Sequence, residues 1–223
     1  MNPALRSSAA HLFVQCLDAP EPNADDAHHL FRVLRVRDGE IVTVTDGAGR
    51  WRVTEVVGRA LRPVGDAIVE PEQPGLTIAS AIPKGDRAEW MVQKLTEIGV
   101  AEIIFLHCAR SVVRWEGERG ERQLERSRRV AREAAMQSRR VWLPRLVGPE
   151  TFASIVRRSG VVLAEPSGES PSTLTSVPTT VVIGPEGGFS EDELAVGVSR
   201  VRLGATVLRV ETAALVAAVT LAL

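Results

Sequence analysis

The stretch at residues 181–190, Val-Val-Ile-Gly-Pro-Glu-Gly-Gly-Phe-Ser, constrains the fold more than any other part of the chain. An apolar β-branched run stops at a loop that holds three glycines in five residues. Ser190, with Glu193 three positions later, is a capping-box pattern for a helix N-terminus. The stretch therefore predicts a buried strand, a tight loop and a helix. In open α/β sheets, such a loop at the carboxyl end of a parallel strand is where small molecules bind.

A second corner follows at residues 203–214, Leu-Gly-Ala-Thr-Val-Leu-Arg-Val-Glu-Thr-Ala-Ala, and we expect the two corners to build one ligand pocket. The first loop matches neither the phosphate loop nor the dinucleotide pattern Gly-x-Gly-x-x-Gly, so a simple turn stays an alternative. No lysine follows Gly188, and Glu186 places a carboxylate inside the loop. The loop therefore suits a neutral or cationic ligand better than a polyanion.

Composition predicts a soluble globular protein, because 44% of the 223 residues are apolar and mean hydropathy is close to zero. Cys16 and Cys108 each lie in an apolar run, so both are predicted to be buried thiols in a reducing cytoplasm. Neither has the spacing of a metal site, and no metal is expected. The sequence shows no segment that resembles a membrane span or a secretory signal, and a cytoplasmic protein is predicted.

The pattern of strands and helices changes near residues 71–75, Pro-Glu-Gln-Pro-Gly, which read as a linker. Before it, a small β-barrel is predicted, with strands at 11–16, 41–45, 51–57 and 67–69 and a helix at 25–34. Asp46-Gly47-Ala48-Gly49 is a strong hairpin signal within it. After it, strands and helices alternate, which predicts a parallel sheet covered on both faces. The predicted strands are 76–82, 101–106, 161–164, 181–183, a short one at 201 and one at 207, and the predicted helices are 87–98, 118–140, 149–156, one after Ser190 and one at the C-terminus. Two domains, 1–72 and 73–223, are therefore predicted.

Positive charge is concentrated in the middle of the chain. Residues 84–145 carry 14 Lys and Arg against 9 Asp and Glu, whereas the whole chain has a net charge of −1. Nine arginines fall between Arg119 and Arg145, with Trp115 and Trp142 at the two ends, an arrangement that suits phosphates and stacked bases. The alternative is an exposed helix whose arginines pair with its own glutamates. His28, His29, Arg32, Arg35 and Arg37 in the first domain have the same two interpretations, RNA contact or solvated helix face.

Several motifs together resemble one known family, the RsmE-type ribosomal RNA uridine N3-methyltransferases of the SPOUT superfamily. The motifs are Gly184-Pro185-Glu186-Gly187-Gly188-Phe189-Ser190 with Glu193, Leu203-Gly204, Leu208-Arg209-x-Glu211-Thr212-Ala213, Lys84-Gly85-Asp86-Arg87, Gln93-Lys94-x-Thr96-Glu97-x-Gly99, Glu133-Ala134-Ala135-x-Gln137-Ser138-x-Arg140 and His29-Leu30-x-x-Val33-Leu34-Arg35. They occur in order over nearly the whole chain. The chain departs from the family pattern at Ala205-Thr206, where a basic residue is frequent, and at Arg139, where a glycine is frequent.

The resemblance implies a fold, a cofactor and a partner. The fold would be an N-terminal PUA-like β-barrel for RNA binding, followed by an α/β SPOUT domain with a trefoil knot and the cofactor site within about residues 160–223. The cofactor would be S-adenosylmethionine. The substrate would be small-subunit (16S) ribosomal RNA, free or in the assembled subunit, and the enzyme would be a homodimer.

The resemblance also assigns residues to sites. The cofactor would be bound by Leu163, Ala164, Glu165, Gly184, Pro185, Glu186, Gly187, Gly188, Leu203, Gly204, Leu208, Arg209, Val210, Thr212 and Ala213. The concentration of positive charge predicts that RNA is bound by Arg32, Arg35, Lys84, Arg128, Arg129, Arg132, Arg139 and Arg140, of which Arg35, Lys84 and Arg140 also stand in the family motifs. Methyl transfer to a uracil nitrogen needs the ring to lose its N3 proton, so an arginine could stabilise the anion, Arg209 or Arg140, and Glu211 could take the proton.

Three rival functions remain open on the sequence: another SPOUT-type RNA methyltransferase, a nucleotide hydrolase that uses the glycine loops, and a non-catalytic RNA-binding protein. The hydrolase lacks the expected loop lysine and any cluster of carboxylates for a metal.

Overall fold

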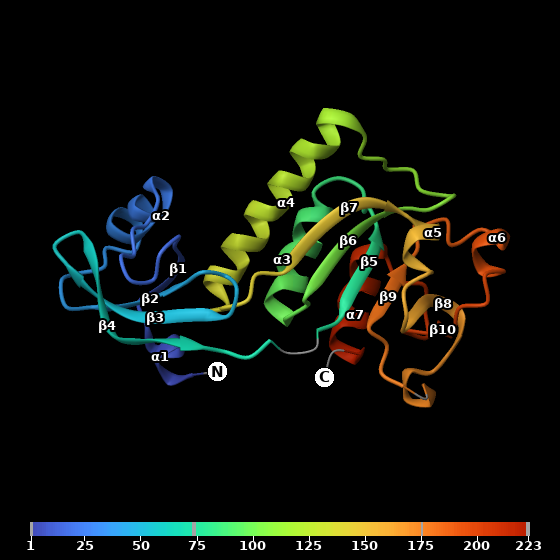
Figure 1. Cartoon of the computed structure of the whole chain (residues 1–223). Coiled ribbons are helices and arrows are strands. Elements are labelled where there is room, and N and C mark those ends of the chain that lie inside the picture. Colours follow the sequence, from blue (N-terminus) through green and yellow to red (C-terminus); the bar gives the residue numbers. More distant parts are fainter. Residues whose placement is uncertain (1, 73–74, 175, 222–223) are drawn as a thin grey trace. The chain divides into compact units, whose positions relative to one another are not determined.

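The computed structural model describes residues 2–72, 75–174 and 176–221 (Figure 1). Residues 1–73 together with 132–143 form one compact unit, and residues 74–131 together with 144–223 form a second. The chain therefore returns to the first unit through residues 132–143, and the predicted consecutive domains 1–72 and 73–223 did not include this return. Residues 73 and 74 of the predicted linker lie outside the described residues.

The first unit is built on a four-stranded sheet with the order β1-β2-β3-β4. β1 pairs with β2 in parallel, and the other neighbours are antiparallel. The predicted hairpin at 46–49 joins β2 to β3 and is confirmed, and the predicted strand at 67–69 is the end of a longer strand. The elements are α1 (Pro3–Ser7), β1 (Ala10–Phe13), α2 (Ala24–His28), the π-helical turn η1 (His29–Val33), β2 (Ile41–Thr45), β3 (Arg50–Val57) and β4 (Ala60–Val69). β1 ends at Phe13, so Cys16 is exposed in the following loop, and the prediction of a buried thiol there was wrong.

The returning segment 132–143 is held to the first unit by buried contacts. Met136 packs into the hydrophobic core around Leu30 and Val44. The carbonyl of Arg140 accepts from His11 Nε2 at 3.1 Å, and Thr43 Oγ1 lies 2.9 Å from His11 Nδ1. These contacts bury His11 to 2% exposure, and they explain why this part of the helical segment belongs to the first unit.

Trp142 also belongs to this return. Its ring lies where a side chain on Gly49 would have to be, because an added Cβ would come within 2.2 Å of it. Ala48 forms an isolated antiparallel bridge to Trp142. Trp142 is thus half-buried against the 46–49 turn, and its stacking on a nucleobase stays a prediction.

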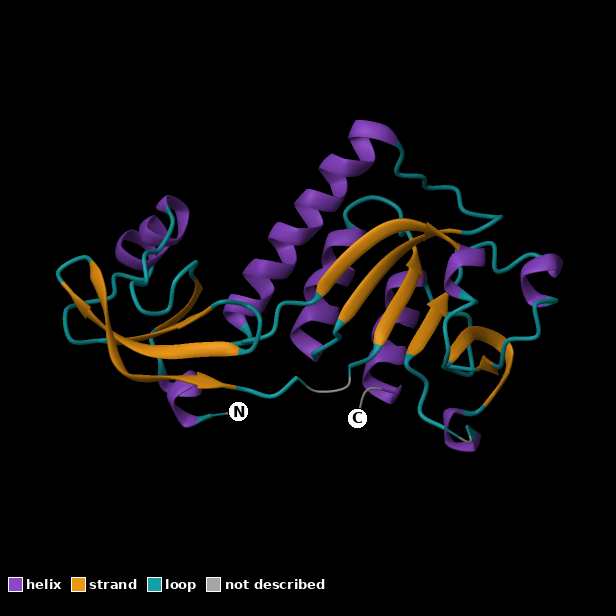
Figure 2. Ribbon diagram, viewed as in Figure 1, coloured by secondary structure: helices purple, strands orange, loops and turns teal. Residues whose placement is uncertain are grey.

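The second unit is a six-stranded sheet in the order β10-β8-β9-β5-β6-β7, in which every neighbouring pair is parallel (Figure 2). This confirms the predicted α/β architecture. β9, which precedes the glycine loop, lies between β8 and β5 and so is an inner strand. The elements are β5 (Thr77–Ala81), α3 (Arg87–Ile98), β6 (Glu102–His107), α4 (Gly117–Gln137), β7 (Arg145–Thr151), α5 (Phe152–Ile155), β8 (Val161–Glu169), the 3-10 turn η2 (Pro171–Thr173), β9 (Thr180–Ile183), α6 (Glu191–Leu194), β10 (Arg200–Val201) and α7 (Val210–Leu221).

Alternation along the inner strands divides the core into two layers. Ile78, Ile103 and Val181 pack in the cluster that includes residues of α3 and α7, and the next residue of each strand packs in the cluster that includes α5 and Phe189. Ile78 is in register with both Ile103 and Val181, so the three side chains form one row. A slip of one residue would exchange the two layers, which is why this register is strongly specified.

Three predicted elements differ from the structure. β7 continues to Thr151, so only 152–155 of the predicted helix 149–156 is helical; Pro149 is tolerated because β7 is an edge strand. No strand forms at Val207, which is 84% exposed in an irregular segment. α4 stops at Gln137 and not at residue 140, since Arg139 has the left-handed φ of 59°.

Burial lowers the pKa of His11 from 6.5 to about 4. The hydrogen bond to the Arg140 carbonyl raises this pKa by a smaller amount, and the charge of nearby Arg139 lowers it by a still smaller amount. As the pH falls, His11 therefore becomes protonated in the unfolded chain before it does in the folded one. The contribution of neutral His11 to the free energy of unfolding is fully present above about pH 6.5 and is lost as the pH falls towards 4. We expect the free energy of unfolding to drop by about 2 kcal/mol between pH 7.5 and pH 5 through this one group. Urea denaturation at the two pH values, with His11→Gln for comparison, measures it. An equal pH dependence in both proteins would contradict this assignment.

Candidate cofactor site at the carboxyl edge of the sheet

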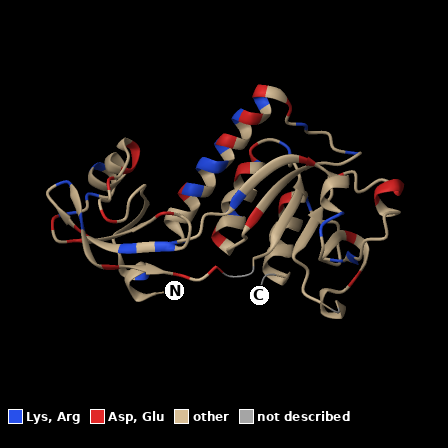
Figure 3. Ribbon diagram, in the orientation of Figure 1, with Lys and Arg blue, Asp and Glu red and all other residues tan. Residues whose placement is uncertain are grey.

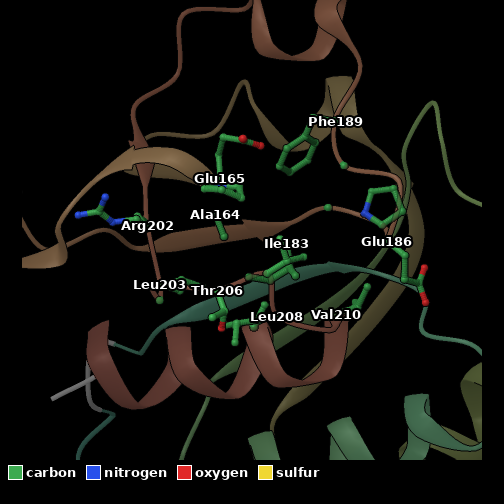
Figure 4. Close-up of a pocket in the computed structure, with 17 residues that line it drawn as sticks. Ala164, Glu165, Ile183, Glu186, Phe189, Arg202, Leu203, Thr206, Leu208 and Val210 are labelled. Carbon is green, nitrogen blue, oxygen red and sulfur yellow. The ribbon is translucent and has the colours of Figure 1, made fainter.

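A cavity of about 120 Å³ that is open to solvent lies at the carboxyl end of β9, beside residues 164–166 of β8. Figure 4 shows its three contributing segments: Ala164 and Glu165 from β8, Ile183 to Phe189 from the end of β9 and the glycine loop, and Arg202 to Val210 leading into α7. Glu165 and Phe189 lie on one side, and Leu208 and Val210 lie on the side of α7. The two glycine corners therefore line one hollow.

The cavity gathers most of the predicted cofactor residues but not all of them. Those that line it are Ala164, Glu165, Gly184, Pro185, Glu186, Gly188, Leu203, Gly204, Leu208, Val210 and Ala213. Leu163, Gly187, Arg209 and Thr212 are not among its lining residues. Six lining residues were missed by sequence reasoning: Pro166, Ile183, Phe189, Arg202, Thr206 and Val207. Arg202, Thr206 and Val207 lie in the irregular segment that was expected to contain a strand.

The glycine loop has its shape because side chains are absent at two positions. A Cβ on Gly184 would lie 3.1 Å from the Phe189 ring, so a larger residue there would force the ring to shift by a few tenths of an ångström. Gly188 has a φ of 70°, and its N–H donates to the Pro185 carbonyl at 2.8 Å, which closes a tight turn. At Gly184 and Gly188 the loop therefore presents backbone to a ligand, between the side chains of Pro185, Glu186 and Phe189.

The capping box predicted at Ser190 is present. Ser190 N–H donates to Glu193 Oε2 at 2.8 Å, and Glu193 N–H donates to Ser190 Oγ at 3.2 Å. Glu193 Oε1 accepts a third bond, from Ala109 N–H at 2.8 Å. The one carboxylate thus fixes the end of the glycine loop to the loop that follows β6. The helix itself is short, since α6 spans only Glu191–Leu194.

The loop after β6 is tied to the glycine loop at a second point, where Arg110 Nη1 donates to the Gly187 carbonyl at 3.1 Å. Within it, Cys108 is buried, and burial, with the nearby Glu193 carboxylate, raises the pKa of its thiol to about 12. This thiol is therefore protonated at neutral pH and is not an activated nucleophile. His107 accepts from Trp115 N–H at 3.2 Å, and burial, followed by the charge of Arg114, lowers the pKa of its imidazole.

Of the predicted catalytic residues, Glu211 and Arg209 stand near the cavity in different environments. Glu211 is in the first turn of α7, and its Oε1 lies 3.5 Å from Arg87 Nε on α3. Its other oxygen, Oε2, is buried and has no hydrogen-bond partner among the described residues. Arg209, the residue before α7, is exposed. The Arg87–Glu211 pair connects the N-termini of two helices that pack together.

The predicted RNA-binding arginines are spread over both units, and several already have partners. Arg132 Nη2 lies 2.5 Å from Asp26 Oδ2 and its guanidinium stacks over the Phe13 ring, all within the first unit. Burial lowers the pKa of both Arg139 and Arg140, and Arg139 donates to the Ser8 carbonyl. Arg128 pairs with Glu125, and Figure 3 shows positive and negative residues interleaved along α4. Arg32, Arg35, Lys84 and Arg129 are exposed.

Within the described ranges, no group of three or more His, Cys, Asp and Glu side chains is arranged to hold a metal ion. In the same part of the chain, none of the helices combines the length and the apolar character that crossing a membrane requires.

Comparisons with known proteins agree with this geometry. An RNA methyltransferase domain family matches residues 70–222, and an RNA methyltransferase PUA domain matches residues 22–59. The chain is 35% identical to ribosomal RNA small subunit methyltransferase E of Mycobacterium bovis, with 87% of this chain and 82% of the relative aligned. It is 32% identical to the protein of the same name from Bacillus subtilis, over 86% of this chain and 85% of the relative.

A solved structure from Legionella pneumophila, which contains the bound cofactor SAM, superposes with a TM-score of 0.80 at 27% identity and covers 95% of this chain and 96% of its own. The likeness extends over both predicted domains. Because the domain family covers more than half of the chain and the curated relatives align over most of it, the chain belongs to the ribosomal RNA small subunit methyltransferase E family of RNA methyltransferases.

Proposed function

We propose that this protein transfers a methyl group from S-adenosylmethionine to N3 of a uridine in small-subunit ribosomal RNA. The observation that carries the proposal is the cavity between the two glycine corners, at the carboxyl edge of a sheet whose fold matches a SAM-bound structure. The names of the curated relatives support ribosomal RNA of the small subunit as the substrate. The cytoplasm, where ribosomes are assembled, is the location that this substrate implies.

The lining of the cavity fits the cofactor by charge. Glu165 and Glu186 line it against one cation, Arg202, together with the apolar side chains of Ile183, Phe189 and Leu208. S-adenosylmethionine carries a sulfonium cation, which supplies an already activated methyl group when it is bound. Carboxylates in the wall favour a cation, and the glycine loop allows close approach to backbone N–H and C=O groups. The residues present therefore fit this cofactor better than a nucleotide polyphosphate.

The residues of the chain must also make the uracil a nucleophile. N3 carries a proton in the neutral ring, so a nearby positive charge that stabilises the anion favours the reactive form. We assign this role to Arg209, because it is exposed beside a cavity wall formed by its neighbours Leu208 and Val210. We assign Glu211 a positioning role, since its carboxylate faces Arg87 on α3 and is not among the lining residues.

We further infer a homodimer, as the family resemblance implies. Static light scattering should then give a mass of about twice 24.1 kDa. A monomer that is fully active at nanomolar concentration would exclude a site shared between two chains.

The cofactor assignment predicts the effect of a side chain at Gly188. We expect Gly188→Val to lower S-adenosylmethionine affinity by at least ~100-fold in calorimetry, because Val disfavours the left-handed φ and would add bulk to the lining. Gly197→Val is the matched control: Gly197 has a φ of 75°, nothing lies near its Cβ position, and it is outside the cavity lining. Similar losses in both variants would mean that backbone strain, and not the cavity, controls affinity.

The substrate assignment predicts the product. N3 lies on the pairing edge of uracil, so the target must be unpaired or flipped from its stack. In a strain that lacks this protein, nucleoside analysis of small-subunit RNA should show the loss of one N3-methyluridine. Wild-type protein should restore it, and Arg209→Met should restore much less while it binds the cofactor normally. A methyl group on carbon-5 or on a ribose oxygen would refute the N3 assignment but leave the methyltransferase intact.

A further inference from the structure

The loop from β6 to α4 has an inner face that packs on the protein and an outer face that is open to solvent. Ser111 Oγ accepts from Cys108 N–H at 2.9 Å, and the Trp115 ring lies 4.5 Å from the Phe105 ring, between centroids. Trp115 is therefore partly buried and packs against the core, and base stacking by its ring stays a prediction. Arg110, Val112 and Arg114 are exposed, with partly buried residues between them. We call these three residues the outer strip.

The outer strip begins at the cavity's glycine loop. Arg110 donates to the Gly187 carbonyl, and both neighbours of Gly187 in the sequence line the cavity. The Ala109 N–H bond to Glu193 holds the base of the strip to the same loop. A ligand that extends out of the cavity across the glycine loop therefore meets Arg110 first. Figure 1 shows this connection between the end of β6 and the start of α4.

The charges of the strip are not neutralised. Among the described residues, neither Arg110 nor Arg114 lies within ion-pair distance of a carboxylate. On α4, Arg122, Arg126 and Arg128 each pair with a glutamate, whereas Arg119 and Arg129 are exposed and have no ion pair among the described residues. Val112 is 73% exposed between the two strip arginines. Two unpaired guanidinium groups with an apolar contact between them match the alternation of phosphate and ribose or base in an RNA strand.

We propose that Arg110 and Arg114 bind RNA phosphates next to the target uridine, and that Val112 contacts the ribose or base between them. The inference rests on the proposed function, which places the target base at this cavity. A flipped base that reaches the cavity brings the backbone of its neighbours to the rim. Phosphate contacts at that rim fix the register in which the base enters. The strip is thus an RNA-binding site separate from the arginines of α4.

The test measures binding to small ribosomal subunits from a strain that lacks this protein, in the presence of S-adenosylhomocysteine. Arg114→Gln should weaken binding roughly 5-fold near 0.15 M salt and lower the salt slope by about 0.7–0.9, as the loss of one phosphate contact does. Arg114→Lys, which keeps the charge, should retain most of the slope. Arg114 makes no hydrogen bond to the glycine loop, so cofactor affinity should be unchanged.

A second pair of variants separates charge from shape. Val112→Asp places a negative charge beside the phosphates and should weaken RNA binding roughly 5-fold or more, whereas Val112→Asn, of nearly equal size, should change it less than about 2-fold. Arg122→Gln on α4, whose guanidinium is paired with Glu118, is the control for a general loss of positive charge and should leave the slope near the wild-type value.

Wild-type affinity and salt slope in both Arg114→Gln and Val112→Asp would overturn the proposal. An equal loss of cofactor and RNA affinity in Arg114→Gln would overturn it too, because the strip would then only support the glycine loop. Failure of the proposed function would look different: wild-type protein itself would neither bind S-adenosylmethionine nor methylate the subunits.

Discussion

The buried carboxylate of Glu193 is the interaction on which the cavity depends. A carboxylate removed from water is strongly destabilising unless hydrogen-bond donors replace the lost hydration. Here two backbone N–H groups from different loops, Ser190 and Ala109, serve as those donors. Satisfying this one charge requires the glycine loop after β9 and the loop after β6 to lie together. The need of the Glu193 carboxylate for hydrogen-bond donors thus fixes the positions of both the cavity wall and the start of the outer strip.

The sequence predicted those parts of the fold that local patterns determine. Helix α3 was predicted with the bounds it has, since helical spacing and Gly99, in the left-handed conformation, define it locally. The capping box at Ser190 was predicted for the same reason. The irregular segment 202–209 was not, because Val207 has a β-forming side chain but no strand beside it to pair with. A residue such as Arg202 enters the cavity through tertiary placement, and no local signal in the sequence marks it.

The number of arginines in a stretch of sequence did not predict which of them lack a carboxylate partner, because ion pairs also depend on tertiary placement. The arginines of α4 form the densest basic run, yet Arg122, Arg126 and Arg128 are each paired, and Arg132 is held by Asp26, more than one hundred residues away in the chain. Arg110 and Arg114 are only two residues in a short loop, and composition gives them no prominence. A carboxylate beside a guanidinium competes with a phosphate for its donors, and the fold determines which arginines have such a partner.

On the proposed function, the carboxyl edge of the sheet must bind the cationic cofactor in the cavity and the polyanionic RNA outside it. Carboxylates at Glu165 and Glu186 line the cavity, and they would repel an RNA phosphate that entered it. The unpaired arginines of the outer strip stand across the glycine loop and would attract that phosphate to the rim. Gly187 lies between the two regions, and Arg110 packs over it: Arg110 Nη1 donates to the Gly187 carbonyl, and an added Cβ on Gly187 would lie 3.5 Å from Arg110 Cβ. On the proposed function, the separation of charge across one glycine loop therefore keeps the phosphates at the rim, and only a neutral part of the RNA, such as a base, is suited to enter the cavity.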